Sequence, residues 1–204
     1  MKTPESPFNE AVRILALKRT HLLDTPREER FDRFTRMAKL AFGVPIALVS
    51  LVDNKRQWFK SSQGLEARET PRDMSFCGHA ILIDRLFIVE NTLEDPRFAD
   101  NPLVTGPPHI RFYAGAQLHS HEGYNLGTLC IIDTRPRSLD HDQCALLEEL
   151  ARCVDEEIND FEANKSRQEQ IEKTRILSAL NNLTVDASAP LERKIDMALD
   201  LGRH

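Results

Sequence analysis

The residues with the clearest potential for chemistry are a cysteine and a histidine that flank one glycine. Cys77 and His79 lie in segment 75–83, for which we predict a short helix. A thiolate at the N-terminus of a helix has a lowered pKa and is reactive, so Cys77 could act as a nucleophile. The alternative is a small buried side chain on a pocket helix, and we favour that structural role.

Two further histidines, His119 and His121, are separated by one residue at the end of a predicted strand. Alternate residues of a strand point to the same face, so the two imidazoles could chelate a metal ion together with Glu122. Two histidines alone do not complete a metal site, because such sites use three or four protein ligands. We therefore favour a solvated hairpin end and predict no metal site.

Charged and polar side chains gather in segment 91–109, which is too long and too rich in proline to suggest regular structure. Asp95 and Arg97 could form an ion pair that orders this loop. Alternatively, Arg97 could bind a carboxylate or phosphate group of a ligand. We favour the ion pair, and we keep Asp95, Arg97 and Asn101 as candidate ligand residues.

Three aromatic side chains on predicted strands are further candidates. Trp58, the single tryptophan, lies on a predicted strand, where such a side chain is more often core than a platform for a ligand. Phe112 and Tyr113 are adjacent on another predicted strand. Neighbouring residues of a strand point to opposite faces of their sheet, so one of these two rings can face a pocket.

Helices and strands that must position these residues follow from the apolar periodicity. Residues 10–23 and 27–42 show the three- and four-residue spacing of amphipathic helices, and Gly43 is a natural C-cap for the second. Asp140 caps a long helix whose apolar stripe extends to Phe161. The predicted strands are 45–53, 56–62, 86–90, 110–119 and 125–133, and residues 64–73 are predicted to form a loop.

Neighbouring strands joined by hairpins, with helices at both ends, indicate an α+β fold with one antiparallel sheet. Strand 47–52 has no polar alternation, so it needs cover on both of its faces. The long helices can cover one face, and only the middle loops and the short helix are free to cover the other. A ligand could therefore lie between the sheet and segments 75–83 and 94–105.

Composition narrows the classes of function. The 204 residues carry a net charge of −5, and no basic stripe favours a nucleic acid or an anionic membrane surface as a partner. No apolar run could span a membrane, and the N-terminus lacks the apolar region of a signal peptide, so we expect a cytoplasmic location. The four cysteines form no CxxC pair, which fits reduced thiols.

Seven segments, including FCGHAI at 76–81 and LGTLCIID at 126–133, together resemble the GAF domains of bacterial signalling proteins. The other five are 44–53, 56–61, 95–98, 101–104 and 110–115, and the resemblance covers about residues 9–161. It implies a GAF-like central antiparallel sheet with helices packed on one face and a loop and short-helix pocket on the other. The implied domains are an N-terminal helix at 1–24, a GAF domain at 25–163, and at 164–204 a helical linker that could begin a second, truncated domain.

The resemblance implies a non-catalytic sensory domain, of the kind found in sensor histidine kinases of two-component systems and in diguanylate cyclases. Such a domain binds a small molecule and signals to an output domain. That domain would lie outside this chain, which has no kinase H-box, ATP-binding glycine motif or GGDEF signature. The resemblance names no cofactor, and the implied ligand-binding residues are Trp58, Phe76, Cys77, His79, Asp95, Arg97, Asn101 and Tyr113.

Two alternatives give Cys77 a direct chemical role. Free methionine sulfoxide reductases share the GAF fold and carry a catalytic cysteine in a similar Cys-Gly pair. Their partner cysteines fall where residues 1–75 of this chain have none, and Cys130 lies in an apolar strand. Phytochrome-like GAF domains anchor a bilin near a cysteine and a histidine, but here Gly78 separates Cys77 from His79 and the aspartate-containing bilin motif is missing.

We also expect a parallel homodimer, since a paired helix is the obvious two-state element through which such a domain can signal. The helix after Asp140 carries Leu147, Leu150, Val154, Ile158 and Phe161 close to heptad spacing, but one face must cover the domain's own sheet. The first helix, over residues 11–22, would add apolar surface. The polar run 162–170 would lead toward the output domain.

Overall fold

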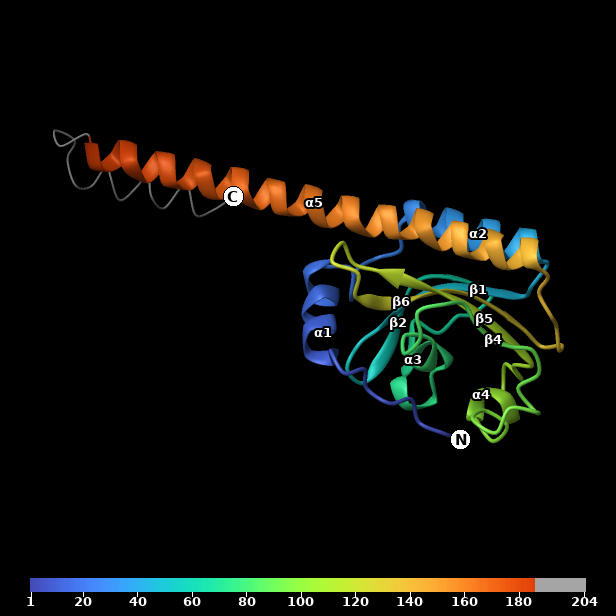
Figure 1. Cartoon of the computed structure of the whole chain (residues 1–204). Coiled ribbons are helices and arrows are strands. Elements are labelled where there is room, and N and C mark those ends of the chain that lie inside the picture. The colour runs from blue at the N-terminus through green and yellow to red at the C-terminus, as the bar shows by residue number, and fades with distance from the viewer. Residues whose placement is uncertain (186–204) are drawn as a thin grey trace. The chain divides into compact units, whose positions relative to one another are not determined.

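A computed structural model describes residues 1–185 of the chain (Figure 1). These residues belong to two compact units, Met1–Asp160 and a second unit that begins at Phe161. The break expected at 186–190 and the helix expected at 191–201 lie outside the described residues. Among those described, no helix is long and apolar enough to cross a membrane.

One antiparallel sheet organises the first unit. Its strand order is β3-β2-β1-β6-β5-β4, and every neighbouring pair is antiparallel. The strands are β1 (Ile46–Val52), β2 (Arg56–Gln63), β3 (Glu69–Pro71), β4 (Phe87–Val89), β5 (Phe112–His119) and β6 (Asn125–Asp133). The central strand β1 is buried along its whole length, as its lack of polar alternation predicts.

Helices cover both faces of this sheet. They are α1 (Glu10–Arg19), α2 (Glu29–Phe42), α3 (Phe76–Ala80), α4 (Pro102–Thr105) and α5 (His141–Val185). In Figure 1, α2 and the start of α5 lie over one face, and the short helices α3 and α4 lie on the other side. The α+β fold and the division into a helix face and a loop face are therefore confirmed.

Helix ends follow from local chemistry. Gly43 ends α2 in the left-handed conformation, with φ +60°, as its predicted C-cap role requires. At the start of α5, the Gln143 backbone N–H donates to Asp140 Oδ1 at 2.8 Å, and the Asp140 N–H donates to Gln143 Oε1 at 3.0 Å. This reciprocal pair is a capping box, and it confirms the cap predicted at Asp140.

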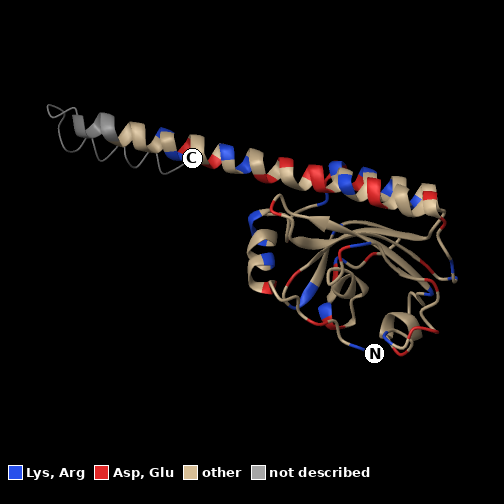
Figure 2. Cartoon of the chain, in the orientation of Figure 1, with Lys and Arg blue, Asp and Glu red and all other residues tan. Residues whose placement is uncertain are grey.

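The apolar stripe of α5 packs onto its own domain. Leu147, Leu150, Val154 and Ile158 are all buried, and α2 contacts strands β1, β2 and β6 on the same side. Figure 2 shows that the charged residues concentrate on helices and loops, whereas the central strands carry few. The sheet is thus a largely uncharged layer between two covers.

One buried cation lies beneath α2. A register shift between Val49 and Ser50 leaves Lys60 without a partner on β1. Its buried ammonium donates to Thr25 Oγ1 at 2.6 Å, to the Pro26 carbonyl at 2.8 Å, and to the Glu28 carboxylate. This β-bulge therefore directs a charged side chain into the segment that precedes α2, where acceptors satisfy all its donors.

Four predicted boundaries or assignments were wrong. The first helix ends at Arg19 rather than at residue 23, because His21 and Asp24 adopt positive φ angles of 52° and 61°. Residues 64–73 contain the edge strand β3, and the strand expected from residue 110 begins at Phe112. Segment 91–109 contains α4, where Pro102 occupies the first helical turn, a position that needs no proline N–H.

Candidate ligand cavity and buried thiol pair

An apolar cavity of about 190 Å³ lies on the loop face of the sheet. Strands β1, β2, β5 and β6 form one wall, and α3 with the segments around Leu65 and Pro107 forms the other. Its polar lining residues are Gln57, Thr70, Cys77 and Tyr113, and no charged residue lines it. Two larger hollows, of about 550 and 510 Å³, are lined partly by charged residues of the β2–β3 region and are open to solvent.

The polar residues at one side of the cavity are satisfied by one another. Gln57 Nε2 donates to Thr70 Oγ1 at 2.8 Å, and the Ser75 hydroxyl donates to Gln57 Oε1 at 2.6 Å. Ser75 also caps α3, because its Oγ accepts the Gly78 backbone N–H at 2.7 Å. These bonds fix the start of α3 against β2 and leave the cavity with little unpaired polar surface.

Stacked aromatic rings border the same cavity. Phe76 lies between Phe98, at a centroid distance of 4.1 Å, and Tyr113, at 5.2 Å. Gly115 makes room for this arrangement, since a Cβ atom there would lie 2.3 Å from the Tyr113 hydroxyl oxygen. The missing side chain at Gly115 therefore allows the Tyr113 side chain to lie along its own strand, with its hydroxyl over Gly115.

The Tyr113 hydroxyl ends at a pair of buried cysteines. It donates to Cys77 Sγ at 3.3 Å, and the Thr128 hydroxyl donates to the same sulfur at 3.2 Å. Cys130, on β6, places its Sγ 4.0 Å from that of Cys77, and both thiols are buried. Two sulfur atoms and two hydroxyl groups thus meet at the junction of α3, β5 and β6.

The two thiols of this cluster differ in acidity. Burial alone raises the pKa of Cys77, but the hydrogen bonds from Cys130, Thr128 and Tyr113 oppose burial, and the pKa falls from 9.0 to about 6. Burial and the neighbouring Cys77 sulfur together raise the pKa of Cys130 well above its usual value. The two hydroxyl donors at Cys77 Sγ therefore favour the thiolate form of Cys77 over that of Cys130.

Three of the eight predicted ligand residues line the cavity, namely Phe76, Cys77 and Tyr113. Trp58 does not, because its neighbours Gln57 and Phe59 point into the cavity and adjacent residues of a strand point to opposite faces. The Trp58 ring instead contacts the guanidinium groups of Arg56 and Arg68. The expectation that either Phe112 or Tyr113 faces a pocket is confirmed for Tyr113.

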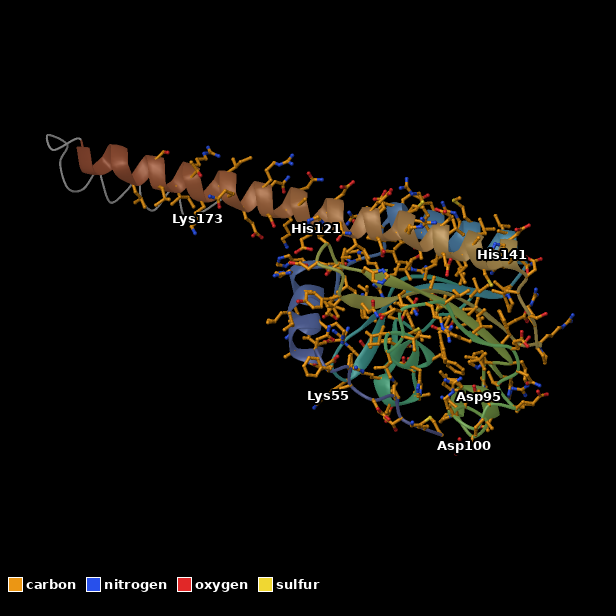
Figure 3. All side chains as sticks on the ribbon, viewed as in Figure 1. Lys55, Asp95, Asp100, His121, His141 and Lys173 are labelled. Atoms are coloured by element: carbon orange, nitrogen blue, oxygen red, sulfur yellow. The ribbon has the colours of Figure 1, made fainter. Side chains whose placement is uncertain are left out.

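The other four predicted residues have structural contacts. Asp95 and Arg97 form the expected ion pair through two guanidinium nitrogens, at 2.9 and 2.6 Å, which lowers the pKa of Asp95. Asn101 caps α4 and donates to the Met74 carbonyl at 2.9 Å, and His79 Nε2 lies 2.9 Å from the Lys2 carbonyl oxygen. In Figure 3, Asp95 lies near α4, on the side of the sheet away from α2.

No group of three or more histidine, cysteine or acidic residues that could hold a metal ion occurs among residues 1–185. His119 Nδ1 lies 3.1 Å from Asp155 Oδ2 on α5, and the His119 backbone N–H donates to Asp155 Oδ1 at 2.8 Å. His121 lies in the turn between β5 and β6 (Figure 3). The two imidazoles are therefore in different settings, and one is already paired with a carboxylate.

Sequence reasoning missed Cys130, Gln57 and Thr70 as neighbours of the cavity. Cys130 alternates with Ile132, which lines the cavity, and pairs across the sheet with Leu48, another lining residue. This alternation could have placed Cys130 on the loop face. Its distance from Cys77, 53 positions earlier in the chain, depends on how α3 docks and has no local signal.

Comparisons with known proteins agree with this geometry. The family model described as GAF domain matches residues 26–155. A Pseudomonas aeruginosa protein named cyclic di-GMP phosphodiesterase is 47% identical over 155 residues, which are 76% of this chain and 26% of that protein. The chain therefore spans about a quarter of the relative's length.

Solved structures share the fold at low identity. A domain of a putative two-component sensor histidine kinase from Sinorhizobium meliloti has a TM-score of 0.56 at 19% identity, over 69% of this chain and 97% of that one. The free methionine-R-sulfoxide reductase of Neisseria meningitidis has a TM-score of 0.55 at 17% identity, over 81% and 98%. Because the identities are so low, these likenesses establish the arrangement of helices and strands only.

Proposed function

The chain belongs to the GAF domain family, and we propose that it is a non-catalytic sensory domain that binds a small molecule and signals to an output domain outside residues 1–204. The observation that carries this proposal is the cavity of about 190 Å³ between the sheet and α3. Family membership makes a regulatory role the natural one. The cavity supplies a place where a regulator can bind.

The lining of the cavity favours an uncharged, mostly apolar ligand. Burial of an unpaired charge costs far more free energy than contacts with apolar side chains can offset. An apolar cavity of roughly 150 Å³ is large enough to bind benzene in another protein. We therefore infer a ligand about the size of one small ring system, with at most one polar group. Cyclic nucleotides and other charged ligands fit this lining poorly.

A signal from the cavity can reach α5 through the sheet. Ile132 of β6 lines the cavity, and its neighbour Ile131 is buried on the opposite face, where α2 and α5 pack. The bonds between His119 and Asp155 connect β5 to α5 directly. A ligand that binds one arrangement of the sheet more tightly would bias the position of α5.

The output domain we propose is one that acts on cyclic di-GMP. The 47% identical relative is named a cyclic di-GMP phosphodiesterase, and three quarters of its length lies outside the match. The sequence-based expectation of a kinase or diguanylate cyclase output stays a prediction. Sequencing the gene beyond residue 204 and assaying the full-length product for cyclic di-GMP hydrolysis tests this assignment.

Ligand binding is tested by thermal unfolding with a defined probe. Indole, which is uncharged, should raise the Tm by several degrees at saturation, because a ligand at 100 times its Kd adds about 2.7 kcal/mol. Leu65→Trp places a large ring at the edge of the cavity and should abolish the shift. Leu93→Trp, at an exposed leucine that does not line the cavity, is the matched control and should keep it.

Cyclic GMP serves as the charged probe in the same experiment and should leave the Tm unchanged. A shift with indole that survives in Leu65→Trp would refute the location of the site. A shift with cyclic GMP alone would refute the inferred ligand chemistry.

A thiol-dependent reductase of free methionine sulfoxide is the second candidate function. The lowered pKa of Cys77 and its place in the cavity wall favour it. The absence of charged lining residues speaks against it, since the amino and carboxylate groups of a free amino acid need charged or strongly polar partners. Turnover of methionine sulfoxide by the chain that vanishes in Cys77→Ser would reverse this ranking.

We propose a parallel homodimer through α1 and α5. The side chains of Val12 and Leu15 on α1 are 46% and 60% exposed, so α1 has apolar surface to offer. The stripe from Leu147 to Ile158 is buried in its own domain, so α5 must use other residues. Light scattering at tens of micromolar protein should report a dimer, and Val12→Glu with Leu15→Glu should give a monomer. A monomeric parent chain would contradict this arrangement.

A further inference from the structure

The pair formed by Cys77 and Cys130 is a feature that reversible ligand binding does not explain. Their sulfur atoms are 4.0 Å apart, and the Tyr113 and Thr128 hydroxyls both donate to Cys77 Sγ. A structural thiol needs no such donors, because a buried cysteine packs as a small hydrophobic side chain. Donors directed at one sulfur stabilise its thiolate, which is the reactive form.

Cys77 can be reached by a small molecule even though it is buried from bulk solvent. Its side chain forms part of the wall of the 190 Å³ cavity, and a water molecule occupies about 30 Å³ in the liquid. A molecule the size of a small peroxide therefore fits beside the sulfur. The uncharged lining admits a neutral oxidant and disfavours a charged one.

We propose that a small, uncharged hydroperoxide entering this cavity oxidises Cys77 and Cys130 to an intramolecular disulfide. This chemistry is covalent and goes beyond the binding function proposed above. The Sγ atoms must approach from 4.0 Å to about 2.05 Å, so disulfide formation requires rotation of the two side chains and a local shift between α3 and β6. Disulfides of this kind in reducing compartments are usually transient and serve redox sensing.

The reaction balances in two steps. In the first, the Cys77 thiolate attacks one peroxide oxygen, the O–O bond breaks, and an S–O bond forms. The departing alkoxide takes up the proton that Cys77 lost, so the products are an alcohol and the Cys77 sulfenic acid. For hydrogen peroxide the alcohol is water.

In the second step, the Cys130 sulfur attacks the Cys77 sulfur. The S–S bond forms, the S–O bond breaks, and hydroxide leaves with the Cys130 proton as water. Two electrons pass from the two sulfurs to the peroxide. Cys130 thus resolves the sulfenic acid, and a cellular dithiol can later reduce the disulfide.

The test uses the chain with Cys144→Ser and Cys153→Ser, which removes the two cysteines outside the buried pair. The folded, reduced protein is treated with hydrogen peroxide, unfolded in an alkylating reagent, and analysed by mass spectrometry without reduction. We expect a product that has lost two hydrogen atoms and carries no alkyl group. Its peptide map should link the segments around Cys77 and Cys130, and dithiothreitol should restore both thiols.

Adding Cys130→Ala to the same background is the matched control. The linked product should be lost, and the Cys77 sulfenic acid should accumulate and be trapped by dimedone. The same peptide map on the parent chain, with all four cysteines, needs no substitution and guards against a variant that fails to fold. Two free thiols after treatment, oxidation of Cys77 that stops short of the disulfide while Cys130 is present, or a link to Cys144 or Cys153 would each overturn the proposal.

Discussion

The two faces of the sheet bury polar groups in different ways. On the helix face, the ammonium of Lys60 is held by three acceptors, and Ser61 is hydrogen bonded to Thr35 and Asp32 of α2. On the loop face, the side chains around the cavity are uncharged, and two thiols lie there 4.0 Å apart. The helix face therefore holds a fully paired buried cation, whereas the cavity on the loop face has an uncharged lining.

This difference suggests separate roles for the two faces: the helix face stabilises the fold, and the loop face holds the cavity in which we propose that a ligand binds. A buried charge with complete partners ties elements together and costs much to disturb. A neutral cavity with small hydroxyl and thiol donors costs less to rearrange and can accept a guest. If the cavity binds a ligand as we propose, the same sheet separates a structural layer from a responsive one.

The largest expected effect is on the helix face. Lys60→Ala should lower the free energy of unfolding by about 3 kcal/mol, the low end for breaking a buried pair, because Glu28 is partly exposed. Urea unfolding measures this change. Lys55→Ala, at an exposed turn position, is the matched control and should change stability by less than about 0.5 kcal/mol. The rate of Cys77 oxidation in the folded Lys60→Ala variant should be unchanged. A slower oxidation in that variant would show that the two faces are energetically coupled.

An intermediate effect is expected from Tyr113→Phe on the loop face. Loss of one hydroxyl should cost about 1 kcal/mol of stability, but it removes a donor to Cys77 and so raises the pKa of that thiol. The rate of Cys77 oxidation in the parent chain should rise with pH through about 6 and then level off. In Tyr113→Phe the rise should move to higher pH.

Tyr124→Phe is the matched control for that profile, because Tyr124 lies outside the cavity. Gly115→Ala offers an independent perturbation, since its new methyl group would displace the Tyr113 hydroxyl. Identical pH profiles in the parent chain, Tyr113→Phe and Gly115→Ala would show that the hydroxyl has no role in the acidity of Cys77.

The smallest expected effect concerns the contact between the sheet and α5. The hydrogen bond to Asp155 raises the pKa of His119 above 6.5, although burial opposes it. The protonated imidazole is thus the form that folding stabilises, so its contribution is complete below about pH 6.5 and is lost as pH rises through the higher folded pKa. For this partly exposed pair we expect less than about 1 kcal/mol.

Chemical unfolding of the parent chain and of His119→Gln, at pH 6 and pH 9, isolates that contribution. The parent chain should be the more stable at pH 6, and the difference should shrink at pH 9. A difference that grows with pH would mean that the neutral imidazole is the form held by Asp155.

Local sequence patterns predict most of the helices and strands. Strand β6 was predicted with its observed limits, and the caps at Gly43 and Asp140 follow from residue type alone. Edge strand β3 has only three residues, too few for a periodic signal, and its pairing with β2 is what makes it a strand. The proline content of segment 91–109 does not predict the helical turn α4, which depends on the position of Pro102 in its first turn.

The candidate site was less predictable, for a related reason. The motifs that contain Phe76, Cys77 and Tyr113 point to three residues of the cavity wall, whereas the face that Trp58 takes depends on the register of its strand. Asp95, Arg97, Asn101 and His79 have polar contacts that order loops. A polar residue of a loop can face a ligand or can hold the loop in place. Which of the two it does depends on how the loop packs against the sheet, and the local sequence does not determine that packing.

The central claim is that a small uncharged molecule occupies the cavity on the loop face. Methyl-detected NMR of the isoleucine-labelled chain, titrated with indole, tests it most directly. We expect saturable shifts for the methyl groups of Ile46 and Ile132, which line the cavity, before any at Ile131 on the other face. Absence of saturable shifts at Ile46 and Ile132, or larger shifts at Ile131, would contradict it.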